Sequence, residues 1–137
     1  MKHLNIKRED KSPEIIFNEK ELRIIGRSNM VNSLAFYKPI INSIRESLEI
    51  DKDKSIQINL HLEYIESTSN FCLLDLLRLF VQYKQNSNND IIIHWYYDFD
   101  DDNMYDLGKE YSQRIGLPFI YISLNTPKNA QKRNIKF

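Results

Sequence analysis

The stretch Tyr64-Ile65-Glu66-Ser67-Thr68-Ser69-Asn70-Phe71-Cys72-Leu73-Leu74 decides the fold expected for this chain of 137 residues. Its first residues end a segment, 55–65, that alternates apolar and polar side chains, which is typical of a half-buried strand. Its last residues begin an apolar run that predicts a helix from about residue 69 to residue 84. No Gly or Pro intervenes, so three hydroxyl residues stand at a strand-to-helix junction, where free N–H groups and the positive end of a helix dipole converge.

The rest of the chain predicts an α/β domain. Further strands are expected at 14–17, 21–25, 91–97 and 119–124, and further helices at about 32–48 and 101–114. The first two strands have hairpin spacing, the strand at 91–97 is apolar on both faces, and Pro39 either kinks the first helix or sits in its first turn. Alternating strands and helices favour parallel pairing, so we expect a mixed, mostly parallel sheet of about five strands with three helices.

Three segments are distinguished along the chain. Residues 1–11 are polar and are expected to form a flexible arm, residues 12–124 the domain, and residues 125–137 a basic tail. Gly116 fits a left-handed cap at the end of the third helix.

Composition excludes several classes of protein. The 19 basic residues equal the 19 acidic ones, which argues against a nucleic-acid binder that works through a general basic field. No apolar run approaches the ~20 residues of a membrane span, and no secretory signal is apparent, so a cytoplasmic protein is expected. The single cysteine, Cys72, excludes an internal disulfide and a cysteine-based zinc cluster. The three glycines lie too far apart for a phosphate-binding loop.

The hydroxyl cluster Ser67-Thr68-Ser69 has two interpretations. It is either a plain helix cap, since Ser and Thr are preferred there, or a site of regulatory phosphorylation. A phosphate beside a helix N-terminus is tolerated by the domain itself. For a partner docking there, however, the phosphate would add negative charge next to Glu66 and a high desolvation cost. Phosphorylation could therefore leave the fold intact and abolish a complex.

The helix behind the cluster carries more apolar side chains than one buried stripe needs. The excess is buried either under neighbouring helices or against another protein. Under the second interpretation, Phe71, Leu74 and Arg78 are the expected partner contacts.

Several short motifs, in their order and spacing, resemble the SiaC family of bacterial regulatory phosphoproteins, relatives of anti-sigma-factor antagonists of the STAS type. The motifs are Ser12-Pro13-Glu14-Ile15, Gly26-Arg27-Ser28, Phe36-Tyr37, Leu62-Glu63-Tyr64 with the hydroxyl cluster, Cys72-Leu73-Leu74-Asp75, Trp95-Tyr96-Tyr97 with the acidic run, and Leu117-Pro118-Phe119. The resemblance covers residues 12–124 and implies a STAS-like fold.

The resemblance also implies a mechanism. In the family the phosphoacceptor is the first hydroxyl residue after the strand, commonly a Thr preceded by Asn. Here Ser67 follows Glu66 at that position, so Thr68 remains a rival acceptor, with Ser69 and Glu66 in supporting roles. The implied partners are a Ser/Thr kinase of the histidine-kinase-like ATPase fold, a PP2C-type phosphatase, and an output protein such as a diguanylate cyclase in biofilm or aggregation signalling. No enzymatic activity, cofactor or metal is expected.

Two other functions remain open from sequence alone. One is a small enzyme, or a ligand- or metal-binding domain, that uses the acidic loop 98–102 and His94, although the glycine and glutamate of an EF-hand are missing. The other is a constitutive adaptor that is never phosphorylated.

Overall fold

The computed structural model describes residues 2–87 and 89–127 of the chain. Its elements, in chain order, are β1 (Leu4–Ile6), β2 (Glu14–Phe17), β3 (Glu21–Ser28), α1 (Ser33–Ile50), β4 (Ile56–Ile65), α2 (Ser67–Asn86), β5 (Ile91–Asp98), α3 (Asp102–Ile115) and β6 (Phe119–Leu124). Within the described residues, no helix is both long and apolar enough to cross a membrane.

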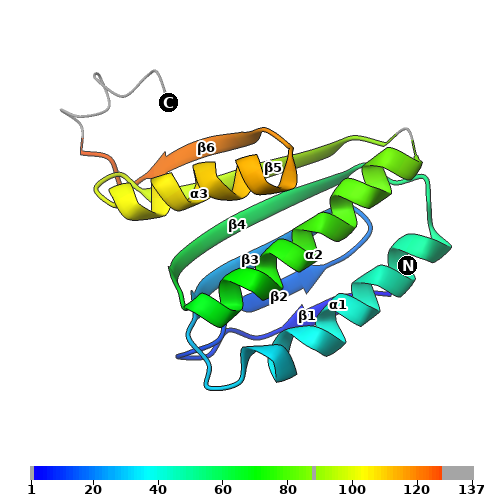
Figure 1. Cartoon of the computed structure of the whole chain (residues 1–137), viewed down its shortest axis with the longest axis horizontal. Helices are drawn as coiled ribbons and strands as arrows, with labels where there is room; N and C mark the ends of the chain where they lie inside the picture. The colour runs from blue at the N-terminus through cyan, green and yellow to red at the C-terminus, as the bar shows by residue number, and fades with distance from the viewer. Residues whose placement is uncertain (1, 88, 128–137) are drawn as a thin grey trace.

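All six strands form one sheet whose strand order equals their order in the chain (Figure 1). The pairs β1–β2 and β2–β3 are antiparallel, and β3–β4, β4–β5 and β5–β6 are parallel. The expected α/β fold with a mixed sheet and three helices is confirmed. The described residues hold one strand more than expected. This strand, β1, lies in the segment that we expected to be a flexible arm, and it pairs with β2.

The three helices cover one face of the sheet. Each of them connects neighbouring parallel strands, and right-handed connections along a sheet that grows in one direction bring all helices to the same side (Figure 1). Burial alternates accordingly along β3, β4 and β5. β5 is an interior strand and is apolar on both faces, but its second face lies on the open side of the sheet, where Ile92 is 46% exposed.

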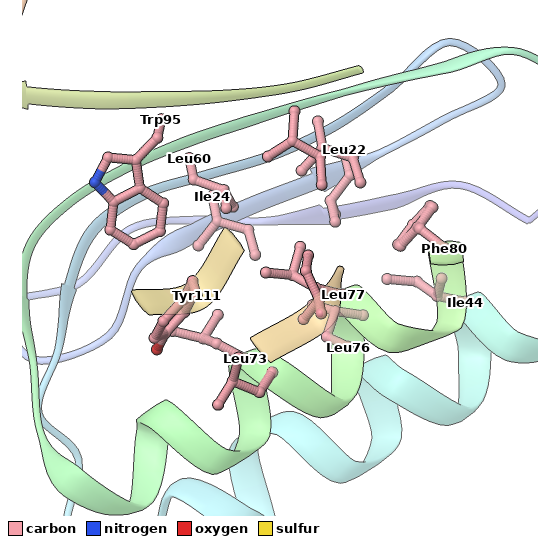
Figure 2. Packing of buried hydrophobic residues seen from close by; sticks show 14 of the residues in the cluster. Leu22, Ile24, Ile44, Leu60, Leu73, Leu76, Leu77, Phe80, Trp95 and Tyr111 are labelled. Carbon is pink, nitrogen blue, oxygen red and sulfur yellow. The ribbon is translucent and has the colours of Figure 1, made fainter. Parts of the chain in front are cut away.

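The core lies between the sheet and this helix layer. Figure 2 shows leucines of α2 pointing toward strand residues such as Leu22, Ile24 and Leu60. α2 packs between α1 and α3, so the apolar side chains that seemed too many for one stripe are mostly buried within the chain. Phe71 is the exception, because it is 67% exposed.

Local sequence explains the ends of the other helices. The Asn32 side chain accepts a hydrogen bond from the Ala35 N–H at the start of α1. Asp101 caps α3 in the same way, and Gly116 ends α3 in the expected left-handed conformation, with φ 77°. Pro39 lies inside α1, beyond its first turn.

α3 approaches β5 closely at a glycine. A Cβ atom on Gly108 would lie 2.5 Å from Nε1 of Trp95, which is buried and donates a hydrogen bond to the Met104 carbonyl. We expect Gly108→Ala to lower the free energy of unfolding by about 1–3 kcal/mol, because overpacking outweighs the better helix propensity of Ala. Urea unfolding followed by the fluorescence of the single Trp measures this. Gln113→Ala, at an exposed position of α3, is the control, and a Gly108→Ala protein as stable as wild type would contradict the expectation.

Candidate functional site

The strand-to-helix junction is capped by a carboxylate rather than by a hydroxyl. α2 begins at Ser67, two residues earlier than expected, and Glu66 is its N-cap. The Glu66 carboxylate accepts hydrogen bonds from the Thr68 N–H at 2.9 Å and the Ser69 N–H at 2.6 Å. The interpretation of the hydroxyl cluster as the cap is therefore wrong: one carboxylate, with two acceptor oxygens, reaches both N–H groups and leaves the hydroxyl groups for other roles.

The three hydroxyl residues lie in different environments. Ser67 and Thr68 are exposed, whereas Ser69 is fully buried. A modifying protein can therefore reach the first two side chains but not the third. This arrangement separates the two candidate acceptors from a residue with a structural role.

A chain of hydrogen bonds runs inward from Glu66. Ser28 Oγ donates to Ser69 Oγ at 2.7 Å, and Ser33 Oγ donates to Glu66 Oε1 at 2.7 Å. Because each hydroxyl group has a single proton, the 2.6 Å contact between Tyr37 and Ser28 must be donated by Tyr37. By the same argument Ser69 donates to Ser33 at 2.9 Å. All protons thus point from Tyr37 through three serines to the carboxylate.

This hydroxyl chain (Tyr37, Ser28, Ser69, Ser33 and Glu66) joins three elements. Ser28 ends β3, Ser33 and Tyr37 lie in α1, and Ser69 lies in α2. The Ser28 carbonyl also accepts a hydrogen bond from the Glu66 N–H at 2.9 Å. The start of α2 is therefore fastened to the start of α1 and to the end of β3. Sequence analysis did not find these partners, although Gly26-Arg27-Ser28 and Phe36-Tyr37 stood among the motifs.

The ionisation states of Glu66 and Tyr37, the two ends of the hydroxyl chain, agree with hydrogen bonds that run from Tyr37 to Glu66. Hydrogen bonds, foremost the one from Ser33 and then that from the Thr68 N–H, hold the pKa of Glu66 at about 2, well below its ordinary value of 4.5. At the other end, burial raises the pKa of Tyr37, so its hydroxyl stays protonated and can donate. The chain thus ends on an ionised acceptor at neutral pH.

Ser67 faces a groove between α2 and α3. Residues that line this α2/α3 groove are Ser67, Asn70, Phe71, Leu74, Leu107, Glu110, Tyr111 and Arg114. Its two walls are joined by a hydrogen bond of 2.5 Å from the Tyr111 hydroxyl to Asn70 Oδ1.

The three expected partner contacts are divided between two sides of α2. Phe71 and Leu74 line the α2/α3 groove, where Phe71 is exposed and Leu74, only 4% exposed, lies at its base. Arg78 points to the other side, toward α1, and pairs with Asp75 at 3.2 Å. The structure therefore does not bring all three together on one surface.

The acidic loop has structural partners. Asp101 caps α3, and Asp98 accepts a hydrogen bond of 2.8 Å from the Asn125 side chain. His94 lies on the open face of the sheet, where its ring contacts Gln57 and Asn59. Within residues 2–87 and 89–127, no group of His, Cys, Asp and Glu side chains is arranged to hold a metal ion.

The fold and the site define a small α/β domain that presents two exposed hydroxyl groups at a capped helix start. A family model described as SiaC family regulatory phosphoprotein matches residues 6–124. The chain therefore belongs to the SiaC family, as its motifs predicted. Since this is a family of regulatory phosphoproteins, the chain is a regulatory protein and not an enzyme.

Solved structures agree on the fold. A chain in the complex of the diguanylate cyclase SiaD with its activator SiaC from Pseudomonas aeruginosa superposes with a TM-score of 0.79 at 21% identity, covering 88% of this chain and 98% of that one. Apo-SiaC from the same organism gives 0.74 at 22% identity, covering 90% and 98%. The sequence matches no curated protein.

The buried and exposed hydroxyl groups should differ sharply in their contribution to stability. Ser69→Ala removes two hydrogen bonds and leaves Ser28 without its acceptor, so we expect a loss of about 1–3 kcal/mol in the free energy of unfolding. Ser67→Ala should change it by less than about 0.5 kcal/mol. Urea denaturation of both variants measures the difference. Equal stabilities of the two variants would show that the hydroxyl chain does not stabilise the fold.

Stability should depend on pH through Glu66. Because folding lowers its pKa from 4.5 to about 2, ionised Glu66 stabilises the fold above pH 4.5, and this contribution is lost as the pH falls from about 4.5 to about 2. The stability difference between wild type and Glu66→Gln should therefore be largest near neutral pH and shrink through that window. Urea titrations at a series of pH values test this. Glu46→Gln removes an exposed carboxylate as a reference, and a Glu66→Gln difference that is the same at pH 7 and pH 3 would contradict it.

Proposed function

We propose that this protein is a phosphorylation-controlled partner switch, with Ser67 as the phosphoacceptor and Thr68 as the rival. The observation that carries the proposal is the position of Ser67: its side chain is exposed at the first residue of α2 and borders the α2/α3 groove. Membership in a family of regulatory phosphoproteins supports it. Thr68 is also exposed but does not line this groove.

The phosphate would act on the surface and not on the fold. Glu66 already occupies the N–H groups of Thr68 and Ser69, which would otherwise bind an anion at this helix start. A phosphoryl group on Ser67 adds about −1.5 to −2 charges beside this carboxylate. It would therefore stay at the mouth of the groove, where a docking partner would have to desolvate it.

The unmodified groove suits a partner contact. Phe71 is a large exposed aromatic side chain on its rim, and Leu74 and Leu107 provide an apolar base. In the Pseudomonas aeruginosa complex, SiaC is the activator of the diguanylate cyclase SiaD. By analogy, the output partner here is a diguanylate cyclase in biofilm or aggregation signalling. A histidine-kinase-like Ser/Thr kinase and a PP2C-type phosphatase would set the phosphorylation state in the cytoplasm.

The kinase reaction tests the acceptor and the switch together. Incubation with ATP and the cognate kinase should add one phosphate to wild type and to Thr68→Ala, but none to Ser67→Ala, as intact mass shows. The phosphorylated protein should then bind the output cyclase at least tenfold more weakly than the unmodified protein in calorimetry, because the new charge opposes desolvation of the groove.

Separate outcomes distinguish the alternatives. Phosphate uptake by Ser67→Ala but not by Thr68→Ala would move the acceptor to Thr68. Phosphorylation without an effect on binding would refute the charge mechanism. A protein that the kinase never modifies, but that binds the cyclase, would be the constitutive adaptor. Phe71→Ala is the matched control for the surface, since it should weaken cyclase binding without preventing phosphorylation.

A further inference from the structure

A second groove runs along the opposite side of α2, between α1 and α2, which lie side by side in Figure 1. Two adjoining hollows form it, and they share Arg45, Leu79 and Gln82. Its apolar lining includes Leu34, which is 61% exposed, and the partly buried Ile41. Apolar and polar side chains thus line the α1/α2 groove in similar measure, and no described element of the chain covers it.

The rim of the α1/α2 groove is basic. Lys38 and Arg45 of α1, Lys52 beyond its end, and Arg78 of α2 line it, together with the two acids Glu49 and Asp75. Arg78 is paired with Asp75. Among the described residues, the other three cations form no ion pair, and Arg45 donates only to the neutral amide of Asn42 at 2.8 Å. Three unpaired cations and one carboxylate thus border the groove of a chain with no net charge.

We infer that the α1/α2 groove binds an amphipathic helix of a partner protein, with an apolar stripe flanked by acidic residues. The apolar part of a groove between two helices accepts the apolar face of a third helix. α1 has 18 residues, so the groove can take a partner helix of about 27 Å, with apolar anchors spaced i, i+4, i+7 and i+11. The charge of the rim selects acidic flanks, which provide specificity and faster association.

This surface is independent of the proposed switch at Ser67. Ser67 lines the α2/α3 groove and not the α1/α2 groove, so the two surfaces lie on opposite sides of one helix. Tyr37, however, contributes to the lining of the α1/α2 groove and also begins the hydroxyl chain that ends at Glu66. The hydroxyl chain thus joins the two walls of the α1/α2 groove at the β4–α2 junction, where Ser67 also lies.

A peptide titration tests the inference on the full-length, unmodified protein. The probe is a synthetic helical peptide of about 18 residues, with leucines at the anchor spacing and glutamates on both flanks. Its counterpart has lysine in place of every glutamate. In NMR titrations of isotopically labelled protein, the acidic peptide should shift amide signals of Leu34, Ile41, Arg45 and Leu79. It should bind at least tenfold more tightly than the basic peptide.

Matched variants separate the groove from general charge. Lys38→Glu with Arg45→Glu should weaken binding of the acidic peptide at least tenfold. Lys20→Glu with Lys109→Glu changes the net charge equally at exposed sites outside the groove and should have little effect. Equal effects of the two double variants, or equal binding of both peptides, would overturn the inference. The same holds if no signals shift, or if shifts cluster at the α2/α3 groove or on the open sheet face.

An anionic membrane surface is the competing occupant. Vesicles of phosphatidylglycerol and phosphatidylcholine provide the test, since a lipid site would bind them through the same cations. Sedimentation of wild type with these vesicles, lost in the Lys38→Glu, Arg45→Glu variant, would assign the groove to a membrane and overturn the partner helix. Because none of these measurements involves the kinase, their failure leaves the proposed function of Ser67 unaffected.

Discussion

The carboxylate of Glu66 holds together the part of the molecule on which the site depends. It binds two N–H groups of α2 and the hydroxyl group of Ser33 in α1. Through the hydroxyl chain its influence reaches the end of β3. Without an ionised acceptor at this position, the direction of the hydrogen bonds along the hydroxyl chain would no longer be determined. Each buried serine could then act as donor or as acceptor toward its neighbour.

This arrangement assigns different tasks to three consecutive hydroxyl residues. Ser69 is buried in the interior, whereas Ser67 and Thr68 lie at the surface. Their hydroxyl groups are not needed as a cap, because Glu66 accepts the hydrogen bonds of the first N–H groups of α2. The buried serine of the hydroxyl chain and the proposed phosphoacceptor are therefore separate side chains. A modification of Ser67 would leave the hydrogen bonds of Ser69 in place.

Periodicity predicted most of the fold. Alternation of apolar and polar residues predicted β4, and the glycine after α3 predicted the end of that helix. Both signals depend on near neighbours in the chain. β1 was missed, since three residues are too few to show alternation. Its pairing is also not local, because Asn5 of β1 lies opposite Ile16 of β2, eleven residues later. The start of α2 was placed too late because Ser is a common cap and Glu is not, and only the structure shows Glu66 bending back over the first turn.

The place of the hydroxyl cluster between a strand and a helix was predictable, but the hydrogen-bond partners of its residues were not. A hydroxyl cluster between a strand and a helix is visible in one stretch of sequence. Ser28 and Ser33, by contrast, come to Ser69 from about forty residues away, and no local pattern marks such a contact. The burial of Leu74 likewise depends on α3, which a helical pattern in α2 alone does not reveal.

The strand order β1-β2-β3-β4-β5-β6 has a consequence for folding during translation. Each strand is added beside the one synthesised just before it, so no strand has to wait for a later segment to be inserted between two earlier ones. A chain emerging from the ribosome can extend the sheet outward from its first hairpin, laying one helix over each new parallel pair. Such a domain can assemble during translation, and during growth the sheet has two unpaired edges, one at β1 and one at the newest strand.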